Sequence, residues 1–236
     1  MRRCPLVVAL VVLLGAAACG GHSTTKADQG KSIAEQAGLG PDVAGFFALA
    51  ANGATATFRS TVETTDAAGR ALQVTTTQRP PDSRFDTFHM DGTVDSTISV
   101  GGKSFQCTMA ANHWDCGELG ATPSTNGQVF NPTVVRGAID AFRQQAADYD
   151  FRVEDRQVVG VTARCLITTR KAGHESDSSL GASATLCLSP SGAVLTVETP
   201  SGSITATAYS TTIPDDAFTL PAPVAPPPSS APTTAN

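Results

Sequence analysis

Residues 184–211, ATLCLSPSGAVLTVETPSGSITATAYST, decide the fold of this chain. Three short segments, Ala184–Leu188, Ala193–Thr199 and Ser203–Thr211, are separated by two turn sequences made of Pro, Ser and Gly. Segments of this length between turn residues are typical of β-strands, and tight turns join strands that are neighbours in a sheet. The stretch therefore predicts an antiparallel meander of three strands.

Upstream of this meander the sequence predicts further strands. From Ala54 to Glu63 small or apolar side chains alternate with polar ones, which is the period of a half-buried strand. Gly101-Gly102 suits a tight primed turn between two strands. The other predicted strands are 72–79, 84–90, 94–100, 104–109, 113–116, 151–154 and 157–169.

Two segments have helical periodicity. The first, Ser32–Ala51, contains Gly38, Gly40 and Pro41, which are expected to divide it into two pieces. The second, Pro132–Tyr149, has a favourable start in Asn131-Pro132 and apolar side chains that recur every three or four residues. The apolar stripe of this second helix consists of Val135, Ala138, Ile139, Phe142 and Ala146.

The first nineteen residues have the layout of an export signal. Two arginines precede the apolar run Leu6–Leu14, and small residues lead to Cys19. The run is shorter than the ~20 residues of a membrane span. A cysteine after three small residues resembles the lipobox of bacterial lipoproteins, with Ala16 where Leu is usual. The resemblance implies that residues 1–18 are a removed signal peptide and that Cys19 carries a diacylglyceryl group; an ordinary signal peptide is the alternative.

Composition divides the remaining chain into three parts. Residues 19–30 are small and polar, as in a flexible tether, and residues 31–220 suffice for a single α+β domain. Residues 221–236 are rich in Pro, Ser and Thr, which predicts a disordered tail.

The charge of the chain limits its partners. Without residues 1–18 the chain has 14 basic and 21 acidic residues, a formal charge of −7. This acidic balance argues against binding to nucleic acid and against a polybasic membrane patch. We therefore expect attachment to the membrane through lipidated Cys19, on the outer face of the cell membrane.

The cysteines outside the signal sequence are Cys107, Cys116, Cys165 and Cys187. An even number in an exported chain favours disulfides, and four cysteines allow three pairings. The local pairing, Cys107–Cys116 with Cys165–Cys187, is the most economical because each pair brackets one predicted hairpin. A zinc site that includes His113 is the alternative, although no CxxC spacing supports it. We expect two disulfides and no metal.

The order of the predicted elements looks like that of the LolA/LppX-like superfamily of bacterial lipoprotein and lipid carriers. The local likeness lies in the C-terminal run, where Thr185–Leu188 and Ser191–Leu195 lead to Ile213–Phe218. The resemblance implies an α+β fold in which a strongly curved antiparallel β-sheet, a half-barrel, is covered on its concave face by helices. It also implies that the space between sheet and helices holds acyl chains, and it carries over no reactive residue.

The sequence contains none of the common catalytic patterns. There is no G-x-S-x-G elbow, no H-E-x-x-H, no phosphate loop and no CxxC. His89 precedes Met90-Asp91, which invites a His/Asp pair, but a carboxylate on a turn is the commoner explanation. Asp215-Asp216 beside a proline is typical of an exposed turn. We therefore expect no enzyme activity and no cofactor.

Two functions are consistent with these features. The first is a membrane-anchored lipoprotein that binds a hydrophobic ligand, either a lipid or an acylated molecule, in an apolar cavity, as a carrier does. The candidate ligand contacts are Val135, Ala138, Ile139, Phe142 and Trp114. The second is a non-enzymatic envelope interaction lipoprotein with a filled core, whose protein partner the sequence does not identify. A cavity of ~300–1,000 Å³ distinguishes the two.

Overall fold

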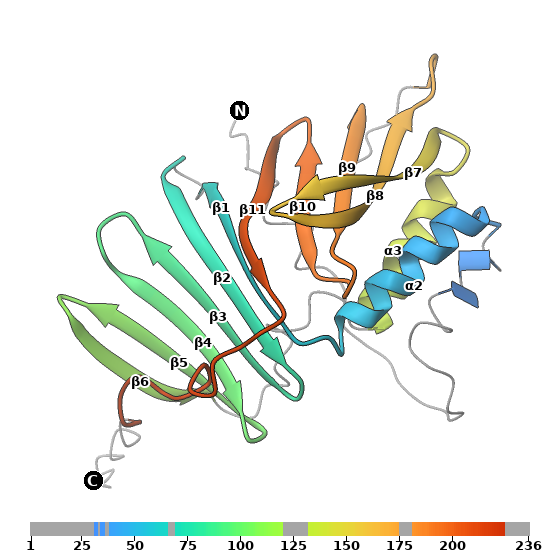
Figure 1. Cartoon of the computed structure of the whole chain (residues 1–236). Coiled ribbons are helices and arrows are strands. Elements are labelled where there is room, and N and C mark those ends of the chain that lie inside the picture. Colours follow the sequence, from blue (N-terminus) through green and yellow to red (C-terminus); the bar gives the residue numbers. More distant parts are fainter. Residues whose placement is uncertain are drawn as a thin grey trace, which may run out of the picture.

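The structure, a computed structural model, describes residues 31–32, 34–35, 38–65, 69–119, 132–174 and 181–224, with only the backbone described at 132–136 and 138. In these residues one antiparallel sheet of eleven strands has the helices α2 and α3 at one end, and residues 31–32 and 34–35 are helical as well (Figure 1). The helices are α2 (Pro41–Gly53) and α3 (Pro132–Gln145). The strands are β1 (Phe58–Thr65), β2 (Ala71–Arg79), β3 (Asp82–His89), β4 (Val94–Val100), β5 (Lys103–Ala110), β6 (His113–Leu119), β7 (Tyr149–Val158), β8 (Val161–Arg170), β9 (Ser183–Leu188), β10 (Val194–Thr199) and β11 (Gly202–Ser210).

The expected α+β half-barrel with helices across its concave face is wrong. The described chain is mostly β, the sheet is not closed, and α2 and α3 pack at the β7–β10 end of the sheet (Figure 1). Size explains the difference. Helices of 13 and 14 residues are about 20 Å long, whereas eleven strands spaced about 4.8 Å apart extend over about 48 Å. Two such helices cover one end of this sheet.

The sheet consists of two meanders joined side by side. The first meander is β1–β6 and the second meander is β7–β11. Its strand order is β6-β5-β4-β3-β2-β1-β11-β10-β9-β8-β7, so every neighbouring pair except β1 and β11 is consecutive along the chain. The predicted meander at 184–211 is confirmed as β9, β10 and β11. Gly101 and Gly102 form the predicted two-residue turn, with φ angles of 60° and 77° between paired Val100 and Lys103.

Several predicted boundaries differ from the structure, and the strand expected from Ala54 begins at Phe58. The segment 157–169 was expected to be one strand, but Val159-Gly160 turns the chain between β7 and β8. The second helix was expected to end at Tyr149, which instead begins β7. The expected break in the first helix is confirmed, because α2 begins at Pro41, after Gly38 with a φ of +75°.

Both predicted disulfides are present, and they lie on one face of the sheet. Cys107 bonds Cys116 between β5 and β6, and Cys165 bonds Cys187 between β8 and β9. Residues paired directly across antiparallel strands share a face, as do residues two apart on one strand. One row of such pairs crosses all eleven strands: Trp114, Met109, Val94, Phe88, Gln73, Glu63, Thr205, Thr196, Cys187, Cys165 and Glu154. We call the face that carries this row the disulfide face.

The helices pack on the opposite face. Leu166 and Leu188, next in sequence to Cys165 and Cys187, belong to a buried core with both helices. Ring contacts continue this core from α2 through α3 to β7, with centroids 5.4 Å apart for Phe47 and Phe142 and 5.2 Å apart for Phe142 and Phe151. The space between helices and sheet is therefore filled by side chains at these positions.

A C-terminal strap, Ile213–Val224, lies on the disulfide face of the first meander. Leu220 and Ala222 pack against the cluster that contains the Cys107–Cys116 bond, and Val224 forms a bridge with Cys116 at the outer edge of β6. Residues 221–224 were assigned to the disordered tail from composition. The rest of that predicted tail, 225–236, lies outside the described residues.

Two glycines let the end of α2 touch the turn between β9 and β10. A Cβ atom on Gly192, whose φ is +85°, would overlap the Leu49 carbonyl oxygen and the Gly53 amide nitrogen. A Cβ atom on Gly53 would overlap the Gly192 carbonyl oxygen. The backbones therefore meet directly, and this contact fixes the β9–β10 turn on the helix.

We predict that Gly192→Ala lowers the free energy of unfolding by about 2 kcal/mol or more, since it adds both an unfavourable φ and an overlap. Gly92→Ala is the matched control, because Gly92 has a similar φ of +83° and no atom near its Cβ position. Urea unfolding of both variants measures the difference. Equal losses of stability would show that the helix–turn contact tolerates a side chain.

Candidate functional site

The β7–β8 hairpin ends in four residues that we call the hairpin tip, Val158 to Val161. Val158 pairs with Val161, so Val159 and Gly160 form a two-residue turn with φ angles of 43° and 80°. Positive φ at both positions defines a type I′ turn, which favours Asn or Gly because a β-branched side chain clashes with the backbone there. Val159 is therefore a conformational outlier. Its side chain is 36% exposed, and few other large apolar side chains in the described residues are exposed to that extent or more.

The hairpin tip packs on a second, smaller core in the second meander. Val158 and Val161 contact a buried cluster formed by Ala163, Cys165, Cys187, Leu195 and Ala206. Val62 and Tyr209 pack against the same cluster from β1 and β11. The tip of β7–β8 thus lies close to the middle strands of the sheet, although β7 is an edge strand (Figure 1).

Two irregularities in the strand pairing surround this cluster. The register of β1 against β11 shifts between Thr61 and Val62, and that of β9 against β10 shifts between Val194 and Thr196. An extra residue in one strand bends it and increases its twist. We attribute the approach of the hairpin tip to the centre of the sheet to these two bends.

Two surface hollows border the tip, and the larger of this pair has Val161 in its wall. Its volume is about 560 Å³ and it is open to solvent. The lining residues are Val161, Pro190, Ser191, Tyr209, Ser210 and Thr211. Tyr209 and Ser191 share a hydrogen bond of 2.7 Å between their hydroxyls, and Ser191 shares another of 2.9 Å with Ser189. These bonds hold the β9–β10 turn against β11, so the wall of the hollow is fixed.

The smaller hollow, of about 310 Å³, borders the other side of the tip sequence. Its lining residues are Arg156, Gln157, Val158, Val159, Cys187, Thr196, Glu198, Thr205 and Ala206. Thr196 is 4% exposed, and its hydroxyl has no hydrogen-bond partner in the described part of the chain. A buried hydroxyl without a partner is unfavourable, and a polar ligand atom beside it would supply the missing bond.

Charges of both signs border the smaller hollow. Arg156 donates from Nε to Glu154 at 2.7 Å and from Nη1 to Glu198 at 3.5 Å, and Arg152 pairs with Glu154 as well. The hydrogen bond from Arg156 holds the pKa of the Glu154 carboxyl below its usual value, and the same bond raises the pKa of Arg156. These groups therefore remain charged at neutral pH, which suits binding of a polar or charged group and not proton transfer.

The ligand contacts expected from the sequence are not brought together. Ile139 is fully buried, and Phe142 packs between Phe47 and Phe151. Trp114 lies in β6, at the opposite edge of the sheet, where it packs against the cluster around Cys107 and Cys116. The side chains of Val135 and Ala138, like Cys19, lie outside the described residues.

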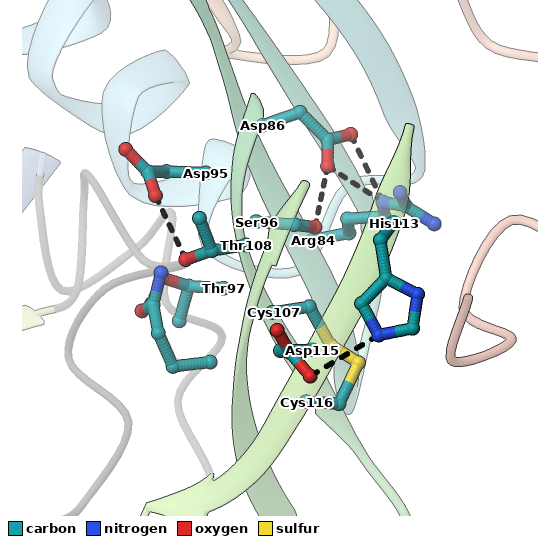
Figure 2. Close-up of a disulfide and its surroundings, with 11 residues drawn as sticks. Arg84, Asp86, Asp95, Ser96, Thr97, Cys107, Thr108, His113, Asp115 and Cys116 are labelled. Carbon is teal, nitrogen blue, oxygen red and sulfur yellow. Dashed lines mark hydrogen bonds and ion pairs between the residues drawn. A yellow bond between two sulfur atoms is a disulfide. The ribbon is translucent and has the colours of Figure 1, made fainter. Parts of the chain in front are cut away.

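The surroundings of the first disulfide are occupied by structural hydrogen bonds. Figure 2 shows Asp86, buried on the disulfide face, accepting bonds from Ser96 at 2.5 Å and from Arg84 Nε at 2.8 and 2.9 Å. Arg84 also donates from Nη1 to the carbonyl oxygen of Ala217 at 3.3 Å, which ties the strap to the sheet. His113 pairs with Asp115 at 3.5 Å. The two sulfurs bond each other and are not the thiolates that the zinc alternative needs.

Histidines pair with aspartates at two other places. His89 contacts Asp95 across β3 and β4 at 3.0 Å. Asp91 accepts bonds from Thr93 in the β3–β4 turn, as expected for a carboxylate on a turn. His174 contacts Asp148 at 2.9 Å. Within the described ranges no group of three or more His, Cys, Asp or Glu side chains is placed to hold a metal ion. In the same part of the chain no helix has the length and apolar character to cross a membrane.

Comparison with known proteins gives distant likenesses. No family model matches the chain, and no curated protein matches it. Among solved structures, the crystal structure of MucB is 18% identical with a TM-score of 0.41, over 73% of this chain and 60% of that chain. An uncharacterized conserved protein from Thermus thermophilus is 11% identical with a TM-score of 0.38, over 73% of this chain and 88% of that chain. Both scores are below 0.5, so the function is argued from the residues of this chain alone.

The hairpin tip and Tyr209 were missed by the sequence interpretation. The signal was present in Val158-Val159-Gly160-Val161, where glycine in a run of valines marks a turn. Reading residues 157–169 as one strand placed these valines in a sheet interior. The approach of Tyr209 depends on a register shift that no local pattern indicates.

Removing the Cys165–Cys187 bond by serine substitution of both residues should lower the free energy of unfolding by about 3.4 kcal/mol, the loop-closure value for a separation of 22 residues. The Cys107–Cys116 bond closes 9 residues, and the same double substitution there should cost about 2.6 kcal/mol. Denaturant titration measures both. A larger loss at Cys107–Cys116 would contradict the loop-length account.

Proposed function

We propose that this chain is an exported lipoprotein, anchored by a lipid on Cys19, whose domain binds an amphiphilic molecule beside the hairpin tip. The observation that supports binding is the larger hollow, whose volume of about 560 Å³ falls within the range of ligand pockets. Val161, Pro190 and Tyr209 give its wall apolar surface. The apolar part of the ligand, such as an acyl chain, lies against this wall.

The second hollow supports the polar half of the proposed ligand. It places Arg156 and Glu198 near the unpartnered hydroxyl of Thr196, on the other side of the tip. A molecule that spans the tip meets apolar surface first and charged groups second. Because both hollows are open, part of the ligand stays in contact with water or with the membrane.

No chemical step is part of this proposal. The titratable groups at the site are held as ion pairs, and the described residues there include no cysteine thiol, since Cys187 is in a disulfide. Binding without reaction is the role that this arrangement supports.

The alternative is an interaction lipoprotein without a small-molecule ligand. Two features favour it: the filled core under α2 and α3, and Met90, which is 79% exposed at the β3–β4 turn. This alternative is distinguished from the proposal by ligand titration.

A fluorescent fatty acid, 11-dansylaminoundecanoic acid, should bind the full mature chain, made soluble by Cys19→Ser, with saturation near one site per molecule. Thr211→Trp fills the larger hollow and should weaken binding at least tenfold, with an unchanged melting temperature, because Thr211 is an exposed lining residue. Thr212→Trp is the matched control, since this exposed neighbour does not line the hollow. Absence of saturable binding to the parent chain would favour the interaction lipoprotein.

Cys19→Ala should release the protein from membranes or leave it unprocessed, since a diacyl anchor provides the two chains that stable attachment requires, at ~0.8 kcal/mol per buried methylene. Membrane fractionation and intact-mass measurement of the wild type and the variant test this. A mature-length variant that stays with the membrane would contradict anchoring through Cys19.

A further inference from the structure

Val159 occupies a position where its residue type is unfavourable for folding. Its φ of 43° is in the left-handed region, and a valine has two branches at Cβ that crowd the backbone there. Asn or Gly is the usual residue at the first central position of a type I′ turn. The local backbone therefore gives no reason for valine at this position.

The core gives no reason either. Val158 and Val161 contact the buried cluster beneath the tip, whereas Val159 is 36% exposed. Val159 instead lines the smaller hollow, together with Thr196 and Arg156. Strain kept at a site without a folding benefit is typical of residues that contact a ligand.

We infer that Val159 is a ligand-contacting residue that sets the preference of the site for an apolar group, at the expense of turn stability. This inference rests on the proposed function, because it places Val159, in the wall of the smaller hollow, beside the path of the amphiphile over the tip. The isopropyl group offers apolar surface at the point where the ligand passes over the tip. A polar side chain in its place keeps the turn and removes that surface.

A second turn in the same sheet provides a matched comparison. Ala111 and Asn112 join β5 to β6 as another two-residue turn, with φ angles of 49° and 62° between paired Ala110 and His113. Ala111 thus holds the same turn position as Val159, at nearly the same φ, and lines neither hollow. Asparagine at either position relieves the strain of the left-handed backbone conformation, but only one of the two positions is at the proposed site.

The experiment compares Val159→Asn, Val159→Ile and Ala111→Asn in the full mature chain carrying Cys19→Ser. Both asparagine variants should raise the melting temperature by about 2–4 °C, because each removes an unfavourable left-handed residue. Only Val159→Asn should weaken binding of 11-dansylaminoundecanoic acid, by about tenfold, as expected for loss of a partly buried apolar contact. Val159→Ile keeps both the apolar surface and the strain, so its affinity should stay within about threefold of the parent.

Failure of this inference is distinct from failure of the proposed function. If the parent chain binds the probe and Val159→Asn binds equally well, the role of Val159 is overturned and the site stands. If Val159→Asn does not raise the melting temperature while Ala111→Asn does, the claim that Val159 lowers the stability of the turn in favour of ligand binding is overturned. If the parent chain does not bind the probe, the proposed function fails as well.

Discussion

The pairing of β1 with β11 is the contact on which the rest of the structure depends. All other neighbouring strands in the sheet follow one another along the chain, so each pairing closes a short loop. β1 and β11 are more than 130 residues apart, and their ladder alone joins the two meanders into one sheet. Closing so long a loop has an entropic cost, which grows slowly with loop length. Burial of Ala206 with Val62 and Tyr209 across the junction helps to offset that cost.

The same junction shapes the candidate site. A register shift in the β1–β11 ladder and another between β9 and β10 lie on either side of the cluster that receives the hairpin tip. Tyr209, paired directly with Ser60, then forms one wall of the larger hollow. The β9–β10 turn forms the facing wall, and it is held by the contact of Gly192 with α2. The site thus depends on long-range geometry from three separate parts of the chain.

The sequence predicted features that depend on local contacts and did not predict those that depend on long-range contacts. The meander at 184–211, the turn at Gly101-Gly102 and both disulfides are local features, and each is confirmed because periodicity or a short bracketing distance specifies it. The helical cover of the sheet was wrong, because the stripe with Ile139 and Phe142 shows only that α3 needs an apolar surface. That surface is supplied by α2 and β7, at one end of the sheet.

The site residues were predicted less well for a related reason. Trp114 attracted attention as the single tryptophan, yet it packs beside its own hairpin disulfide. Val159 was inconspicuous in a run of valines, and the role proposed for it rests on its φ angle and its exposure. A backbone conformation that disagrees with its residue is visible in a structure and hidden in a sequence. Such disagreements are expected to concentrate at functional sites.

Photo-crosslinking with a diazirine-bearing fatty acid tests the central claim most directly, because it locates the ligand on the chain. The mature protein is irradiated with the probe, digested and mapped by mass spectrometry. The account predicts labelled peptides from the hairpin tip, residues 156–161, and from the facing wall, residues 190–211. Labelling confined to α2 and α3 would show that the ligand enters between helices and sheet instead, and it would contradict the site proposed for this fold.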